Sequence, residues 1–547
     1  MALVILALAC SPAPSQPEAP VAHDFDLIIR GGEVLDGTGS PPVRADVGIR
    51  GDTIAAVGDL SGSSTRTTLD AEGRIVAPGF IDLLGNSQAA VLIDPNLEGK
   101  IRQGVTTEVT GEGRSPGPVS EAMAAEMERT KPEGWPRVTW RTLGEFGEVV
   151  MRKGTALNFA FYVGATNPRE MVLEDENRAP TPEELERMVA IVRQARAEGA
   201  VGVASALIYP PGRFATTAEL IALAREGGSY WTHLRSEGSA IEEAIDEAVT
   251  IAREAGVPLN IFHLKVGGSA NWGRMPAIVR RIEAARASGV DIASCVYPYT
   301  ATSTALTSIV PAWALEGSYL DFVARLKNPD TRARIREALA SGRLAGDGAS
   351  TIVVRGIPSE TMKRYERMRL DAIAEAMKVG AAEAALRLFE ESRSSPIGIY
   401  FSLDEDDMRH ALVQPWVAVC SDSGAVVGKM RESGAHPRAY GTFPRILGVY
   451  VREEKLMPLE EAVRKMTSLA ASRAGLSDRG TLRAGMKADV VVFDPETIAD
   501  RSTYEDPHHF SVGIDHVIVN GSPVFRDGKM TGVLPGRILG SGVTGKP

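Results

Sequence analysis

The feature that most constrains the fold is the alternation, through the middle of the chain, of short apolar runs with longer segments of helical character. The apolar runs lie at residues 79–85, 104–111, 157–164, 199–209, 229–235, 258–265, 290–299 and 416–424. One of the segments between them opens with Thr181-Pro182 and closes on Gly199, as helices do. Parallel strands joined by helical crossovers produce this alternation. Eight such units predict an α/β fold, a (β/α)8 barrel of the TIM type.

The two ends of the chain have a different texture. Residues 24–76 contain short apolar runs separated by Gly and Asp turns, and residues 480–540 repeat this pattern. Such spacing indicates the short strands of a small antiparallel sheet. We therefore expect the two ends to pair into a small β-sandwich domain that flanks a barrel at residues 77–479. Inside the barrel segment, residues from about 311 to 400 predict a helical insertion whose role the sequence leaves open.

The composition excludes several classes of protein. The chain has 547 residues, of which 44% are hydrophobic, which suffices for one large domain and a satellite. Its net charge of -10 and the lack of a Lys/Arg run argue against nucleic acid and acidic membrane surfaces as partners. Three scattered cysteines, at positions 10, 295 and 420, predict neither a disulfide framework nor a Cys-x-x-Cys metal site.

The N-terminus reads MALVILALAC, followed by SPAPSQPEAP. This apolar run is too short to cross a bilayer. It resembles the back half of an export signal that ends in a lipoprotein cleavage box, with Cys10 as the lipidated residue and the following tract as a tether. A positively charged n-region is missing, and Ala7 stands where Leu is preferred. We expect residues 1–23 to be a signal and linker, and the protein to be periplasmic or membrane-anchored; the alternative is a disordered tail.

Three polar side chains stand at the ends of apolar runs. His233 ends the fifth run, His263 ends the sixth and Asp422 ends the eighth. The carboxyl ends of barrel strands meet at one mouth, where barrel enzymes place their chemistry. Two imidazoles and a carboxylate around an open water position are typical of catalytic zinc. A single histidine at a strand end is more often a satisfied core residue, so the prediction rests on the combination.

With these residues in place, the chain resembles the D-aminoacylase (N-acyl-D-amino-acid deacylase) family of the amidohydrolase superfamily. The resemblance is carried by PGFID (78–82), GVTT (104–107), GAVGVASALIYPPG (199–212), THLRSEG (232–238), HLK (263–265), YPYTATST (297–304), SDS (421–423), HPRAYGTFPRILGVYVREE (436–454) and DRGTLRAGMKADVVVFDP (478–495). These stretches run in family order and cover roughly residues 25–530. The resemblance implies a (β/α)8 barrel with a β domain from both termini, and hydrolysis of the amide of N-acyl-D-amino acids or related dipeptides.

The resemblance also implies roles for five residues. His233 and His263 match zinc ligands, and Asp422 matches the general base that takes a proton from the attacking water and passes it to the leaving amine. Lys265 matches a lysine that pairs with the α-carboxylate of the substrate, and Tyr209 matches a tyrosine of the substrate pocket.

Three further residues are candidate substrate contacts. Tyr297 and Tyr299 flank a proline, and the alternation of a strand would send both to one face, so we expect Tyr299 to reach the substrate. Arg438 stands in HPRAYG, where it either clamps a carboxylate or braces a loop. His436, in the same stretch, is a candidate to help stabilise the oxyanion.

The departures from the family concern the metal ligands. The His-x-His of the family's first strand is Leu84 and Asn86 here, and the family's cysteine ligand is Gly113. Related deacetylases of the superfamily also lack the first-strand histidines and use a Glu with two His. We therefore expect Glu112 to be the anionic ligand; Glu108, inside the second run, is the rival. The expected cofactor is one Zn²⁺ per chain, or another divalent ion.

Three readings of the function remain open at this point. The first is a zinc-dependent amidohydrolase acting on a small N-acyl amino acid or dipeptide. The second is an inactive, metal-free barrel that binds a ligand. The third is a hydrolase of cyclic amides or lactones. No recognisable pattern of the sequence encodes the acyl group, the side chain or the D or L configuration of the substrate, or the oligomeric state of the protein.

Overall fold

The computed structural model describes residues 23–131, 135–432 and 434–540, and it contains a closed parallel barrel. The barrel strands are β6 (Phe80–Gly85), β7 (Val105–Thr110), β8 (Asn158–Phe161) continued by β9 (Val163–Gly164), β10 (Val203–Ala206), β11 (Tyr230–His233), β12 (Leu259–Ile261), β13 (Ile292–Val296) and β17 (Val417–Val419). Neighbouring strands pair in parallel from β6 to β17. A parallel bridge between Gly85 and Ser423 then joins the last strand to the first. Each strand coincides with a predicted run, so the predicted (β/α)8 barrel is confirmed.

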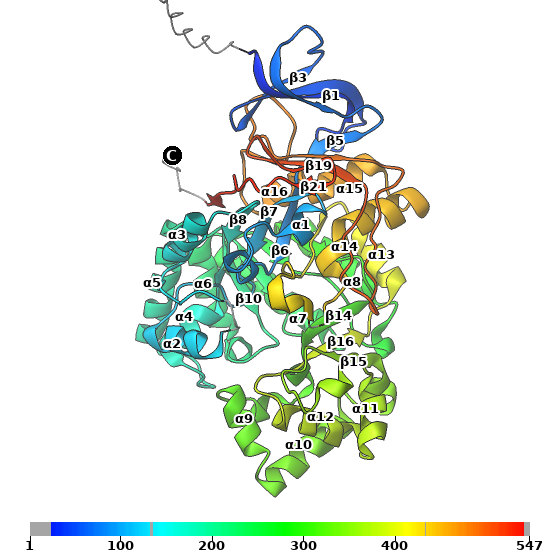
Figure 1. The fold of residues 1–547 in the computed structure, drawn as a ribbon. Coiled ribbons are helices and arrows are strands. Elements are labelled where there is room, and N and C mark those ends of the chain that lie inside the picture. The colour runs from blue at the N-terminus through cyan, green and yellow to red at the C-terminus, as the bar shows by residue number, and fades with distance from the viewer. Residues whose placement is uncertain (1–22, 132–134, 433, 541–547) are drawn as a thin grey trace, which may run out of the picture.

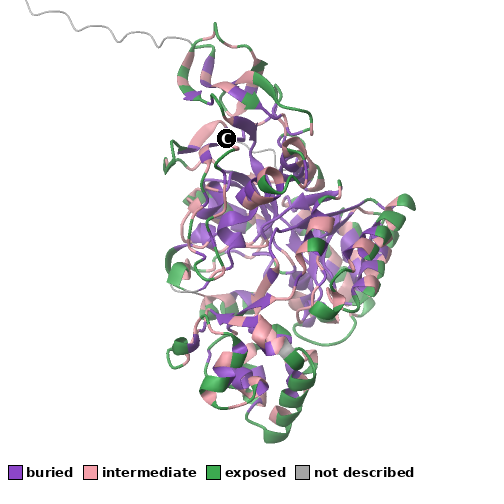
Figure 2. Ribbon diagram, turned by 90° about the vertical axis from the view of Figure 1, so that its right-hand side faces the viewer, coloured by how far each residue is buried: buried purple, intermediate pink, exposed green. Residues whose placement is uncertain are grey.

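The barrel strands are buried along their length for a physical reason. Every residue of β6, β7, β10 and β11 is buried, because side chains fill the barrel interior and helices cover its outside. Figure 2 shows this buried layer across the middle of the molecule. Most of the strands are consequently rich in apolar residues and lack the alternation of a half-exposed sheet.

Helices connect the strands and cover the barrel. They are α1 (Glu98–Ile101), α2 (Glu121–Thr130), α3 (Leu143–Lys153), α4 (Thr166–Leu173), α5 (Pro182–Ala197), α6 (Thr217–Gly227), α7 (Ile241–Ala255), α8 (Met275–Ala287), α13 (Glu405–Leu412), α14 (Arg438–Arg445), α15 (Leu459–Met466) and α16 (Ser468–Arg473). Helix α5 begins with a capping box, in which Thr181 and Glu184 each accept the backbone N–H of the other. Helix α7 ends at Gly256, whose φ of 73° suits glycine. Local sequence signals thus define both helices.

The two ends of the chain form one nine-stranded sheet, at the top of Figure 1. Its strands are β1 (Phe25–Val34), β2 (Val43–Arg50), β3 (Thr53–Gly58), β4 (Thr65–Asp70), β5 (Ile75–Pro78), β18 (Val490–Phe493), β19 (Ile514–Val519), β20 (Ser522–Arg526) and β21 (Lys529–Met530). The ends meet where β18 pairs with β5. The sheet is mixed, because β1 pairs in parallel with β4 and β5. The strand β22 (Ile538–Leu539) leaves this domain and pairs with β8 of the barrel.

An insertion separates β13 from α13 and lies at the end of the barrel opposite the β domain (Figure 1). It contains α9 (Tyr319–Arg325), α10 (Pro329–Ser341), α11 (Leu370–Met377) and α12 (Ala381–Glu390). It also contains a three-stranded antiparallel sheet, formed by β14 (Ala301–Ala305), β16 (Ile397–Phe401) and β15 (Ile352–Arg355) in that order. The expectation of a helical segment was therefore wrong in part. The insertion encloses an apolar core of its own.

The predicted export signal, including Cys10, lies outside the described residues. In the parts of the chain that the structure describes, no helix combines the length and the apolar character that crossing a membrane requires.

Candidate metal and substrate site

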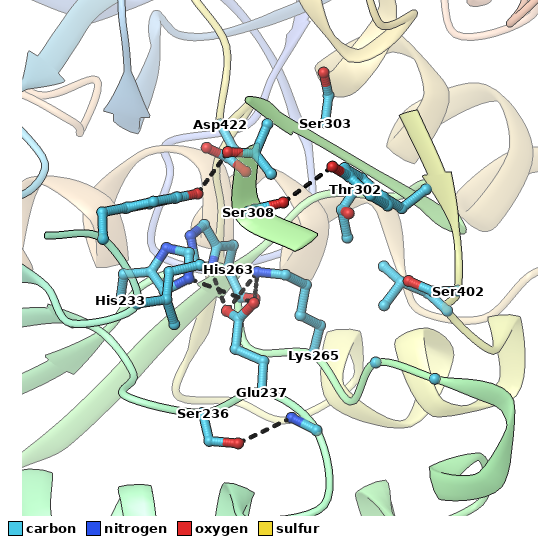
Figure 3. Close-up of a pocket in the computed structure, with 18 of the residues that line it drawn as sticks. His233, Ser236, Glu237, His263, Lys265, Thr302, Ser303, Ser308, Ser402 and Asp422 are labelled. Carbon is cyan, nitrogen blue, oxygen red and sulfur yellow. Dashed lines mark hydrogen bonds and ion pairs between the residues drawn. The ribbon is translucent and has the colours of Figure 1, made fainter. Parts of the chain in front are cut away.

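A cavity of about 790 Å³ opens at the carboxyl ends of the barrel strands. Its walls come from the loops after the strands and from the insertion sheet (Figure 3). Most of the predicted site residues line it, namely Glu112, Tyr209, His233, His263, Lys265, Asp422 and Arg438. The parallel topology explains this gathering, because it brings the ends of all eight strands to one mouth.

One carboxylate and two imidazoles meet at the base of this cavity. The Oε1 atom of Glu112 lies 2.9 Å from Nδ1 of His233 and 3.2 Å from Nε2 of His263. His233 is the last residue of β11, and His263 follows the neighbouring strand β12. The ligand atoms of the three residues lie within 4.8 Å of one another. This donor set is that of a mononuclear zinc site with an open position, so the residues present fit a catalytic divalent metal.

A second carboxylate, that of Glu237, faces the other nitrogen of each ring. Its Oε1 lies 3.1 Å from Nδ1 of His263, and its Oε2 lies 3.5 Å from Nε2 of His233. Figure 3 shows this carboxylate pointing at the imidazoles. Carboxylates behind metal-binding histidines fix the orientation of the rings. Glu237 is not among the residues predicted from the sequence, although it lies in the THLRSEG stretch, because no pattern marks a loop carboxylate as a partner of two rings.

The two carboxylates change the protonation of the site. Burial alone would lower the pKa of His233, but Glu237 and Glu112 raise it to about 9. Burial would raise the pKa of Glu112, but hydrogen bonds from His233 and His263 hold that pKa well below its ordinary value. Burial likewise opposes ionisation of Glu237, and the neighbouring cations outweigh it, which lowers the pKa of this carboxyl. A metal ion therefore meets ionised carboxylates and a protonated imidazole whose proton it must displace.

The predicted base, Asp422, follows β17 and is held by Arg438. Its Oδ2 lies 2.7 Å from Nη1 of the buried guanidinium. Both Asp422 and His263 have left-handed backbone conformations, with φ of 49° and 35°. Residues other than glycine rarely adopt this region, and such strain concentrates at functional sites.

His436 does not line the cavity, which corrects its predicted role at the oxyanion. Its Nε2 donates to the carbonyl of Ala301 at 3.0 Å, and its Nδ1 accepts the backbone N–H of Arg438 at 3.0 Å. Burial and the charge of Arg438 hold the pKa of this imidazole well below its ordinary value. The neutral ring therefore positions Arg438 from behind.

The three aromatic and cationic candidates differ in placement. Tyr209 lines the cavity, and its hydroxyl lies 2.7 Å from Oγ1 of Thr304. The ammonium of Lys265 also faces the cavity, 2.5 Å from Oε1 of Glu237. Tyr299 does not line it, because its hydroxyl donates to Asp500 at 2.7 Å. The expected alternation fails there, since β13 ends before the two tyrosines begin.

Comparison with known proteins decides the family. A model described as an amidohydrolase family matches residues 421–525. The D-aminoacylase of Alcaligenes xylosoxydans xylosoxydans is 36% identical over 95% of this chain and 98% of its own length. The chain belongs to the D-aminoacylase family. The predicted family is thereby confirmed.

Two solved structures of this family superpose on the chain. A D-aminoacylase described by its binuclear metal centre, with one-metal activation and second-metal attenuation, shares 35% identity. An N-acyl-D-glutamate deacylase from Bordetella bronchiseptica, complexed with zinc and a phosphonate inhibitor, shares 33%. Each superposition covers 94% of this chain and the whole chain of the solved structure, with a TM-score of 0.79.

Within the D-aminoacylase family, the place of the missing His-x-His can now be described. Leu84 is buried in the barrel, and Asn86 lines the cavity. Nearby, the fully buried Lys100 places its ammonium 2.7 Å from Asp82 and 3.3 Å from Glu108. The lysine of α1 thus pairs with the carboxylates of the first two strands. The sequence analysis did not single it out, since it lies in a polar stretch without a motif.

The rival ligand, Glu108, is engaged in this buried cluster. Its carboxylate accepts the backbone N–H and the hydroxyl of Ser87, each at 2.7 Å. Among the described residues, the group with metal-binding geometry is the one around Glu112.

Proposed function

We propose that the protein hydrolyses the amide bond of N-acyl amino acids, of D configuration, or of related dipeptides, with one Zn²⁺ held by Glu112, His233 and His263. The observation that carries the proposal is the convergence of these three ligand atoms within 4.8 Å. The names of the relatives support the substrate class, since they are a D-aminoacylase and an N-acyl-D-glutamate deacylase. The zinc complex of a solved relative supports the choice of metal.

A single metal is proposed because the first-strand ligands are absent. Leu84 offers no donor atom, and the carboxylates of Asp82 and Glu108 are already paired with Lys100. A buried ammonium between two carboxylates offsets one of their two negative charges, and burial raises the pKa of Glu108, which favours its neutral form without a second ion. The relative with a binuclear centre is described as activated by one metal, which agrees with activity from a single ion.

The residues of this chain divide the chemistry as follows. When bound, zinc lowers the pKa of water from about 15.7 toward about 7 and polarises the amide carbonyl. Asp422 accepts the proton of the attacking water and returns it to the leaving nitrogen. Arg438 holds the carboxylate of Asp422 at the cavity wall, and Glu237 orients the histidine rings.

Substrate recognition is proposed for Lys265 and Tyr209. The Lys265 ammonium lies two residues beyond a metal ligand, where it reaches an α-carboxylate beside the scissile amide. Its ion pair with Glu237 holds it in place before the substrate arrives. Tyr209 packs its ring 5.6 Å from that of His233 and lines the same cavity.

The test combines metal content with a substrate panel. Freshly purified protein is analysed for metal, then assayed on matched pairs of N-acyl-D- and N-acyl-L-amino acids, on dipeptides and on cyclic amides and lactones. We expect about one zinc per chain and turnover of the D substrates. Turnover of the cyclic compounds alone would show that the substrates are cyclic amides or lactones and not N-acyl amino acids. If the protein holds no metal after zinc is added and hydrolyses no compound of the panel, it is an inactive barrel that binds a ligand.

A further inference from the structure

A second hollow, of about 260 Å³, lies on the insertion sheet and shares no lining residue with the substrate cavity. Its charged and aromatic lining consists of Arg355, Arg367, Arg369, Phe401, Tyr504 and Glu505. Tyr504 and Glu505 come from the C-terminal part of the chain, and the others come from the insertion. The hollow is therefore formed where these two segments meet.

Strand alternation collects the arginines on one face. In β15, Ile352 and Val354 point into the core of the insertion, whereas Val353 and Arg355 line the hollow. The segment after β15 runs back beside it, because Arg369 forms an antiparallel bridge with Val353. The neighbouring Arg367 holds a left-handed conformation, with φ of 68°. The backbone thus brings three guanidinium groups around one hollow.

The contacts of these guanidinium groups are mostly uncharged: Arg369 donates to the carbonyl of Ser350 and lies 5.4 Å from the ring centroid of Phe401. Among the described residues, no carboxylate forms an ion pair with Arg355, Arg367 or Arg369. By contrast, Arg332 of the same insertion pairs with two glutamates. Arg355 is only 3% exposed, and its Nε and Nη1 atoms have no hydrogen-bond partner among the residues that the structure describes. Its remaining terminal nitrogen, Nη2, donates to the carbonyl of Tyr504. Burial and the charge of Arg367 lower the pKa of Arg355.

The charged groups of the lining indicate the ligand. Three guanidinium groups and one carboxylate, that of Glu505, line the hollow, while the carboxylates of Glu366 and Asp506 act on Arg355 and Arg367 from outside the lining. Buried cations without a partner are costly, and a dianion would offset that cost. Guanidinium groups bind phosphate oxygens in pairs of parallel hydrogen bonds.

We propose that this hollow binds the phosphoryl group of a phosphate or phosphate monoester. The exposed Arg367 and Arg369 supply the donors at the rim, and the buried Arg355 adds its positive charge beneath them. The rings of Phe401 and Tyr504 give an attached organic body an apolar surface. The site lies outside the substrate cavity, and it does not depend on the proposed amide hydrolysis.

Binding to the metal-loaded protein is measured by titration calorimetry at constant ionic strength and pH 8, with inorganic phosphate, phenyl phosphate and benzoate as probes. We expect one phosphate or phenyl phosphate per chain at this site. Arg367→Gln and Arg369→Gln should each weaken binding about tenfold, the loss of one charged hydrogen-bonding partner. Both side chains are exposed, so the variants should fold. Arg364→Gln is the matched control, because this exposed arginine of the same segment stacks on Tyr365 and does not line the hollow.

The probes distinguish the source of the phosphoryl group. Tighter binding of phenyl phosphate indicates a monoester, and equal binding indicates free phosphate. The proposal is overturned if neither phosphate compound binds at millimolar concentration. It is also overturned if both arginine variants bind as tightly as Arg364→Gln, which would place the anion elsewhere, or if benzoate matches phenyl phosphate.

Discussion

Glu237 and Lys265 form an ion pair of 2.5 Å inside the substrate cavity, directly behind the two histidines. The same carboxylate oxygen lies 3.1 Å from Nδ1 of His263. One side chain therefore connects the proposed metal ligands to the proposed anchor of the substrate carboxylate. Its removal should affect both metal binding and substrate binding.

Glu237→Gln tests this connection. The amide keeps the shape of the side chain but loses the charge that orients the imidazoles, so we expect metal affinity to fall about 10- to 100-fold. Chelator competition measures this change. Glu121→Gln, an exposed carboxylate on α2, is the control and should leave the affinity unchanged. Equal affinities in the two variants would contradict the role assigned to Glu237.

Glu112→Ala should abolish tight metal binding. The substitution removes the anionic ligand and leaves two imidazoles, which hold zinc weakly without a third donor. Elemental analysis of the purified variant should then find far less than one metal per chain. Full occupancy in this variant would show that another residue is the ligand.

Asp422→Asn should separate chemistry from metal binding. The amide can neither accept nor return the proton, so we expect kcat to fall by about a hundredfold or more, the usual contribution of a general acid or base. Metal content should remain as in the unmodified protein, because Asp422 contacts Arg438 and is not in the group of three ligands. Near-normal turnover in this variant would show that Asp422 is not the general base.

Metal affinity should depend on pH through His233. The pKa of this imidazole is raised to about 9 in the metal-free site, so its proton competes with the metal at lower pH. The affinity should therefore increase by up to about tenfold per pH unit below pH 9 and level off above it. Chelator competition between pH 6 and pH 10 measures this dependence. A flat profile from pH 6 to pH 9 would mean that His233 is already neutral there.

Lys100→Met should destabilise the fold. It leaves the buried carboxylates of Asp82 and Glu108 without their cation, and the loss of one partner of a buried pair costs about 3–5 kcal/mol. Denaturant unfolding measures the change. Lys131→Met, which breaks a partly exposed pair with Glu128, is the control and should cost less than about 1 kcal/mol. Similar losses in both variants would contradict the structural role of Lys100.

The fold and the ligands at the strand ends could be predicted because their signals are local. Burial on both faces makes most barrel strands rich in apolar residues, and His233 and His263 stand at the ends of such runs. The substrate contacts were predicted less well. Tyr299 and His436 lie beside the cavity residues in sequence but bond to Asp500 and Ala301 instead. Both residues lie in irregular segments, where no strand or helix periodicity predicts the direction of a side chain.

The sequence by itself determined the order of the strands, the pairing of the two chain ends and the positions of Glu112, His233 and His263 at one mouth. Periodic burial and strand ends are properties of neighbouring residues, and they are therefore visible in the sequence. Only the tertiary structure decided that Glu237 faces both histidines and that Lys100 pairs with the carboxylates beneath the missing His-x-His. The hydrogen bond between Lys100 and Ser421 joins residues 321 positions apart. Such contacts depend on how the closed barrel brings distant side chains together, which no local pattern records.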